Sequence, residues 1–220
     1  MNQARQNANP AQFTWMGAFG SVLSARIATL GVAFLGAVFM GRLIGPAAYG
    51  YFAILVNITY VAVGFAGSAI DSSLVRFAAK HMDKEEERAL GYFRGALRLK
   101  LWIAVGLIAL GIVCARPLAA AVLVDDEGHQ APAYLVTLAF SAGAVLTLTG
   151  FAQAYYQAQQ RFGRYAGLEL LNAVLRWTAI GLLLFVGYRH LGGLFAVYAV
   201  APIVTCGIAW SMLPRTLWHT

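Results

Sequence analysis

Residues Tyr51–Ile70 read YFAILVNITYVAVGFAGSAI, a run of 20 residues without a charged side chain. A helix needs roughly 20 mainly apolar residues to cross the ~30 Å hydrocarbon core of a bilayer. The run therefore predicts a membrane-spanning helix. It ends on Asp71, with Arg76 and Lys80 shortly after it. A carboxylate at the end of such a run needs a partner or a wet cavity, because an unpaired charge in hydrocarbon is costly.

The composition of the whole chain agrees with a membrane protein. Of the 220 residues, 60% are hydrophobic and 11% are charged, whereas soluble domains are about 45–50% apolar and about 25% charged. The net charge of +7 lies in segments between apolar runs, which indicates a membrane surface and not nucleic acid. Cys114 and Cys206 lie in separate apolar segments, so neither a disulfide framework nor a metal cluster is predicted.

The apolar runs predict an all-α integral membrane fold of six transmembrane helices, because the runs are long and continuous. The expected spans are residues 17–41, 51–75, 99–124, 133–157, 168–188 and 194–213, between a tail of residues 1–16 and an end of residues 214–220. Arg116-Pro117 interrupts the apolar run of the third span, whose uncharged part, residues 101–115, is short, so the Arg116 side chain is expected to extend to the far interface. Residues 81–100, HMDKEEERALGYFRGALRLK, predict a short helix on the membrane surface.

The basic residues sort to one side of these spans. If the N-terminus is inside, the inside segments hold Arg5, Lys80, Lys84, Arg88, Arg94, Arg98, Lys100, Arg161, Arg164 and Arg215, and the outside segments hold Arg42, Arg116 and Arg189. Cytoplasmic segments carry an excess of lysine and arginine. We therefore predict a multi-pass protein of the inner (plasma) membrane with both termini in the cytoplasm, and interfacial anchors at Arg76, Lys80, Arg161 and Arg164.

Three short motifs resemble one family. They are GRLIGPAAYGY at residues 41–51, Asp71 with Arg76-Phe77 at the end of the second span, and YYQAQQRFGRY at residues 155–165. They resemble two turns and the end of the second span in the Wzx-type O-antigen and teichoic-acid flippases, within the multidrug/oligosaccharidyl-lipid/polysaccharide exporter superfamily. Ala69 stands where glycine is more usual in that family.

The resemblance implies a lobe of six helices that pairs with a second lobe around a central cavity. The chain is then expected to be the N-terminal lobe, as a fragment, a truncated product or a self-assembling half. The implied function is to translocate a lipid-linked oligosaccharide or polysaccharide precursor by alternating access. The implied substrate is an undecaprenyl-type lipid-linked sugar, and polysaccharide synthesis proteins are possible partners. We expect no enzyme activity, no cofactor and no nucleic acid partner.

Polar residues inside the spans are the candidates for lining a substrate cavity: Arg26, Asn57, Asp71, Glu169, Asn172 and Arg176. A charge at mid-membrane costs about 2.5–3.5 kcal/mol on insertion scales, so the place of each charged residue among them needs an explanation. Glu169, Asn172 and Arg176 share one helical face, which indicates either a cavity wall or a Glu–Arg contact between helices. Arg26 either faces a substrate pyrophosphate or extends to the interface. Asn57 either joins the cavity or links two helices.

Two other functions fit parts of the sequence. A cation-coupled drug exporter of the same superfamily would favour net acid in the cavity, which Arg26 and Arg176 oppose. A membrane-embedded transferase of envelope polysaccharide synthesis would need a catalytic set at the lipid–water boundary. Only the acidic loop Asp125-Asp126-Glu127 offers such a set.

Overall fold

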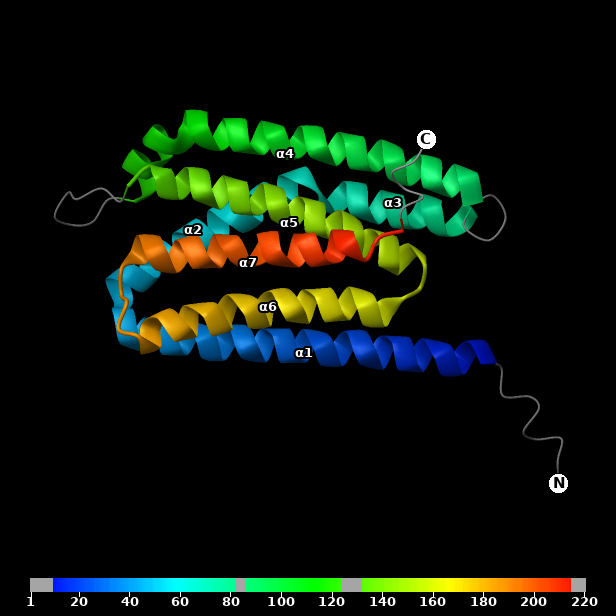
Figure 1. The fold of residues 1–220 in the computed structure, drawn as a ribbon, viewed down its shortest axis with the longest axis horizontal. Coiled ribbons are helices and arrows are strands. Elements are labelled where there is room, and N and C mark those ends of the chain that lie inside the picture. Colours follow the sequence, from blue (N-terminus) through cyan, green and yellow to red (C-terminus); the bar gives the residue numbers. More distant parts are fainter. Residues whose placement is uncertain (1–9, 82–85, 124–131, 215–220) are drawn as a thin grey trace, which may run out of the picture.

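The computed structural model describes residues 10–81, 86–123 and 132–214, and over these ranges the chain is all helical, without a strand. The seven helices are α1 (Pro10–Ile44), α2 (Pro46–Ala66), α3 (Ser68–His81), α4 (Glu86–Val122), α5 (Tyr134–Ala158), α6 (Phe162–Phe185) and α7 (Leu191–Ser211) (Figure 1). Six of them, all but α3, contain segments long and apolar enough to cross a membrane. The predicted all-α integral membrane fold is confirmed.

The long helices lie side by side and run up and down the bundle. The start of α1 and the end of α7 lie at the same end, together with the α5–α6 turn, the end of α3 and the start of α4 (Figure 1). The α1–α2 and α6–α7 turns lie at the opposite end. We call these the basic end and the opposite end, because the first carries Lys80, Arg88, Arg161 and Arg164.

Helix α5 is the centre of the bundle. It packs against α2, α3, α4, α6 and α7, and small buried residues such as Ala139, Gly143 and Ala152 allow the close approach. Helix α1 is the opposite case, because it packs mainly against α6 and leaves Leu30 and Phe34 about two-thirds exposed. In a bilayer such apolar side chains contact lipid or further protein.

The turn between α1 and α2 has the form that its sequence predicts. Gly45 alone separates the two helices, with a φ of 85° that favours glycine. Pro46 occupies the first turn of α2, where its missing N–H costs nothing.

The second span differs from its prediction, because it is broken and not continuous over residues 51–75. Helix α2 ends at Ala66, and α3 begins at Ser68 after Gly67, whose φ and ψ are −144° and −34°. The Gly67 N–H still bonds to the Val63 carbonyl, and the Asp71 N–H bonds to the Gly67 carbonyl. The backbone hydrogen bonds therefore continue across the bend, as glycine–serine pairs allow. Asp71 lies in the first turn of α3.

The third span also differs. Helix α4 is continuous from Glu86 to Val122, so residues 86–100 belong to the helix of the third span and are not a separate surface helix. As in the predicted span, Arg116-Pro117 lies within it. Pro117 lacks only the N–H that would bond one turn back. Lys100, predicted among the cytoplasmic loop charges, lies within this helix and is fully buried.

Candidate functional site

Arg176 in the middle of α6 is a buried cation with hydroxyl partners. Its exposed fraction is 5%. Its Nη1 donates to the hydroxyl oxygen of Tyr198 on α7 at 2.8 Å and to that of Tyr60 on α2 at 3.4 Å. The guanidinium carbon lies 3.9 Å from the centroid of the Tyr198 ring, which adds a cation–π attraction. One side of the planar fork is therefore fixed by two aromatic residues.

Among the described residues, the other side of the Arg176 fork has no hydrogen-bond partner. Nε and Nη2 are buried and make no hydrogen bond, and Arg176 forms no ion pair with any residue in the described ranges. A buried charge without a counter-ion is expensive, and two adjacent guanidinium donors match the oxygens of a phosphate or carboxylate. The geometry fits an anion that comes from outside this part of the chain.

Arg176 lies beside a cavity of about 270 Å³. The lining comes from α1, α2, α6 and α7 and includes Ala33, Asn57, Tyr60 and Trp177. Asn57 and Tyr60 are exposed, whereas Arg176 is buried. The cavity thus combines aromatic walls with a few polar groups, as ligand sites commonly do. We call it the Arg176 pocket.

A polar stripe extends from this pocket toward the basic end, between α1 and α6. Glu169 and Asn172 precede Arg176 on the same face of α6, and Glu169 lies about 10 Å from it along the helix axis at 1.5 Å per residue. Arg26 on α1 approaches Glu169 at 4.0 Å, between Nε and Oε1. One buried side-chain oxygen each of Thr29, Glu169 and Asn172 makes no hydrogen bond to any described residue. Polar atoms left this way indicate water or a ligand along the stripe.

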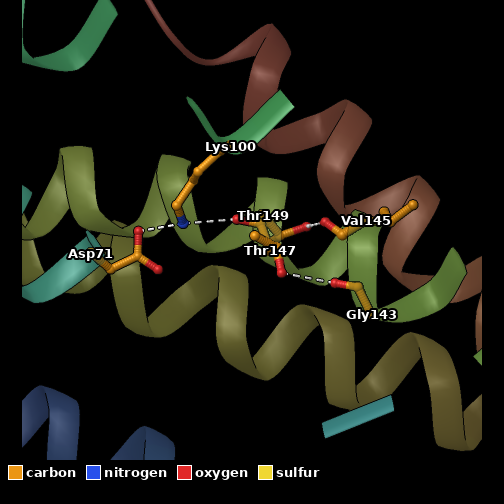
Figure 2. A network of polar contacts seen from close by, with 6 residues as sticks. All are labelled: Asp71, Lys100, Gly143, Val145, Thr147 and Thr149. Carbon is orange, nitrogen blue, oxygen red and sulfur yellow. Dashed lines mark hydrogen bonds and ion pairs between the residues drawn. The ribbon is translucent and has the colours of Figure 1, made fainter. Parts of the chain in front are cut away.

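Asp71 lies in a different polar centre, between α3, α4 and α5 (Figure 2). Its carboxylate forms an ion pair with Lys100, whose side chain is 0% exposed. Lys100 Nζ also donates to the Thr147 carbonyl at 2.9 Å. The Thr147 hydroxyl donates to the Gly143 carbonyl of its own helix, so only the backbone carbonyl of Thr147 accepts from Lys100 (Figure 2).

The ion pair rests against a glycine of α5. A Cβ built on Gly150 would lie 2.9 Å from a carboxylate oxygen of Asp71 and 3.6 Å from Lys100 Nζ. Only glycine leaves this space. The charge of Lys100 therefore has an internal anion and a prepared site, unlike that of Arg176.

The structure thus divides the six predicted cavity residues into two groups. Arg26, Asn57, Glu169, Asn172 and Arg176 belong to the Arg176 pocket and its stripe. Asp71 is held by Lys100 and does not line that pocket. Glu169 approaches Arg26 and not Arg176, so the Glu–Arg contact between helices joins α1 to α6 through Arg26, and Arg176 takes no part in it. The proposed role of these residues toward a substrate stays a prediction.

The predicted anchors lie at the basic end. Arg76 and Lys80 are exposed on α3, Arg161 precedes α6, and the Arg164 guanidinium lies 5.7 Å from the centroid of the Tyr156 ring. The acidic loop Asp125-Asp126-Glu127 lies outside the described residues.

Sequence reasoning missed several residues of these sites. Tyr60 and Tyr198 carry no charge, so nothing marks them against other membrane tyrosines. Tyr60 does follow Asn57 by three residues, which places both on one face. Lys100 was hidden by its place at the edge of a basic segment. Asp71 could have indicated Lys100, because a carboxylate inside a span needs a cation as its partner.

Comparison with known proteins places the sequence in one protein family. A family model described as polysaccharide biosynthesis protein matches residues 18–219. Neither a curated protein nor a solved structure matches the chain.

Proposed function

Because the chain belongs to the polysaccharide biosynthesis protein family, we propose that it takes part in translocating a lipid-linked oligosaccharide or polysaccharide precursor across the membrane. The family match confirms the relationship indicated by the three motifs, and with the six apolar helices it supports polysaccharide export by a multi-pass membrane protein. We propose further that the protein is a flippase that works by alternating access, and therefore a transporter and not an enzyme.

The observation that carries the proposal is the vacant side of the buried Arg176 fork. A lipid-linked sugar presents a phosphate or pyrophosphate between its lipid tail and its sugar. Arg176, which lines the pocket, has two buried guanidinium nitrogens without a hydrogen bond among the described residues. The pocket adds aromatic walls at Tyr198 and Trp177 and an exposed side at Asn57. Arginine suits this group because its planar fork can bind two oxygens at once.

The polar stripe gives the substrate a route toward the basic end. Arg26 is 61% exposed and lies one turn inside the apolar segment Val22–Ile44. It can therefore meet an anionic headgroup near the interface before that group reaches Arg176. In this proposal the sugar and phosphate follow the stripe while the undecaprenyl-type tail stays in lipid.

The exposed apolar face of α1 supports a second six-helix unit as the other wall of the cavity. Leu30, Phe34 and Leu35 are each about two-thirds exposed on this helix. A polar stripe open to lipid would cost several kcal/mol for each unsatisfied group, so a second wall is needed during transport. Rocking of the two units, driven by an ion gradient, would open the pocket to alternate sides.

We further propose that the basic end faces the cytoplasm of the inner membrane. The exposed cations Lys80, Arg88, Arg161 and Arg164 lie there, while Arg42, Arg116 and Arg189 lie toward the opposite end. This asymmetry follows the positive-inside rule. A cytoplasm-specific fluorescent reporter fused at Gly163 should be bright, and one fused at Gly187 should be dark.

Export in the cell that encodes the protein tests the proposed function. The complete gene product would carry Arg176→Lys, Arg176→Gln or Arg116→Gln, and surface polysaccharide and membrane abundance would be measured together. We expect partial export with lysine, near-complete loss with glutamine, and normal export for Arg116→Gln, which removes an exposed charge. Normal export by Arg176→Gln at normal abundance would refute the proposed role.

A further inference from the structure

A second cavity lies between α3 and α4, away from the Arg176 pocket. Its volume is about 390 Å³, within the range of about 300–1,000 Å³ that is typical of ligand sites. The walls include Ile70, Ser73 and Phe77 from α3 and Tyr92, Gly95 and Leu99 from α4. None of these residues lines the Arg176 pocket, and the described parts of α1 and α4 do not contact each other. We call this cavity the α3–α4 groove.

The groove is open to the surroundings of the bundle and is almost wholly apolar. Phe77, Tyr92 and Leu99 are each about half exposed along it. From Ala69 to Phe77, the α3 residues that line it, the groove covers about 12 Å at 1.5 Å per residue. That length is most of one leaflet, which is about half of a ~30 Å hydrocarbon core. Its dimensions fit an extended hydrocarbon chain of one leaflet.

An aromatic cluster closes the groove at the basic end. The rings of Phe77 and Tyr92 stack with centroids 6.1 Å apart, and the His81 ring lies 5.6 Å from that of Tyr92. His81 Nδ1 lies 2.9 Å from the Phe77 carbonyl oxygen, which holds the imidazole against its own helix. Aromatic rings of this kind mark the headgroup level of a membrane.

Cations lie just beyond these rings. Lys80 follows Phe77 by three residues, and Arg88 precedes Tyr92 by four, so each shares a helix face with a ring of the cluster. Both side chains are exposed. Lys80 forms no ion pair with any residue in the described ranges. Along the groove, apolar walls are followed by aromatic rings and then by cations. This order matches that of an anionic lipid, in which an acyl chain is followed by the glycerol region and then by the phosphate.

We propose that the α3–α4 groove binds one anionic phospholipid of the leaflet at the basic end. One acyl chain lies between Ile70 and Leu99, the glycerol region contacts the Phe77–Tyr92 pair, and the phosphate approaches Lys80 and Arg88. The site is separate from the transport pocket, so this lipid is a resident of the bundle and not its cargo. It fills the space beside α3, the segment that carries Asp71.

Native mass spectrometry of the full chain tests the groove, with dioleoyl phosphatidylglycerol and dioleoyl phosphatidylcholine as probes. A lysine near anionic lipid contributes about a fivefold preference. We expect Lys80→Gln to lower phosphatidylglycerol affinity about fivefold and to leave phosphatidylcholine unchanged, with Lys80→Arg close to wild type. Arg189→Gln removes an equal charge at the opposite end and serves as the control. An equal loss in Lys80→Gln and Arg189→Gln would overturn the proposal.

A second pair of variants tests the groove's shape. A Cβ at Gly95 or at Gly91 meets nothing within 4 Å, but only Gly95 lines the groove. Gly95→Leu should therefore reduce bound phosphatidylglycerol, and Gly91→Leu should not. Soluble glycerol phosphate should not displace the lipid. Equal binding by the two leucine variants, equal affinity for the two lipids in the wild type, or displacement by glycerol phosphate would each contradict an anionic phospholipid in this groove.

Discussion

Among the described residues, two buried cations have opposite surroundings. Lys100 on α4 has a carboxylate from Asp71 and a carbonyl from Thr147. Arg176 on α6 has two tyrosine hydroxyls and one ring, but no anion among the described residues. A charge that is neutralised inside the chain supports the fold, whereas one left without an anion is available to a ligand. Similar residue types at similar depth thus have different roles because of their neighbours.

Removal of the Lys100 charge should have the largest effect on stability. Lys100→Met leaves the Asp71 carboxylate without its cation, and breaking a buried pair in this way costs about 3–5 kcal/mol. We expect a large fall in the unfolding temperature in detergent and in the amount of folded protein. Asp71→Asn combined with Lys100→Met should recover much of that loss. If the single and double variants are equally unstable, Lys100 is not stabilised through Asp71.

Crowding of the same pair from the α5 side should have a smaller effect. Gly150→Ala places a methyl group 2.9 Å from the Asp71 carboxylate, and we expect it to destabilise by about 1–3 kcal/mol. Gly106→Ala in α4 is the matched control, because a Cβ there meets nothing within 4 Å; it should be neutral or stabilise by up to about 1 kcal/mol. Thermal unfolding of both variants measures the difference, and equal stability would argue against a tightly packed pair.

The two tyrosines of the Arg176 pocket should differ from each other. Tyr198→Phe removes a 2.8 Å hydrogen bond to Arg176, and Tyr60→Phe removes one of 3.4 Å. We expect Tyr198→Phe to weaken binding of an isoprenyl pyrophosphate by about 0.5–1.5 kcal/mol and Tyr60→Phe by less. Titration calorimetry measures both affinities. A larger effect at Tyr60 would mean that Tyr198 is not the main support of the guanidinium.

Removal of the Arg176 charge should have the smallest effect on stability. Arg176→Met loses the bond and the ring contact to Tyr198, but it also removes a buried charge that has no counter-ion. These terms oppose each other, so we expect the free energy of unfolding to change by less than about 1 kcal/mol. The same measurement on Lys100→Met supplies the comparison. An equally large loss in both variants would show that Arg176, too, is structural.

The sequence predicted the number of spans and the α1–α2 turn because both depend on local signals. Apolar length decides the first, and Gly45-Pro46 decides the second. The α2–α3 break and the start of α4 at Glu86 were not predictable in this way. Gly67 permits a bend without requiring one, and the packing against α5 decides the outcome.

The candidate site was predicted in part for a similar reason. The helical repeat placed Glu169, Asn172 and Arg176 on one face, but it could not say which neighbour each would meet. Arg26 meets Glu169, and Asp71 meets Lys100, through contacts between residues far apart in the sequence. Only the three-dimensional arrangement separates the cation with an internal anion from the one without.

The most direct test of this difference is calorimetric binding of geranyl pyrophosphate to the purified chain in detergent. The probe carries a pyrophosphate and an isoprenoid chain but no sugar. We expect wild type and the Asp71→Asn/Lys100→Met double variant to bind it with similar affinity. Arg176→Gln should bind about 10- to 150-fold more weakly, because a hydrogen bond to a charged group contributes about 1.5–3 kcal/mol. Equal affinity of Arg176→Gln and the wild type would contradict the assignment of Arg176 as the buried cation that binds the anionic group of a ligand.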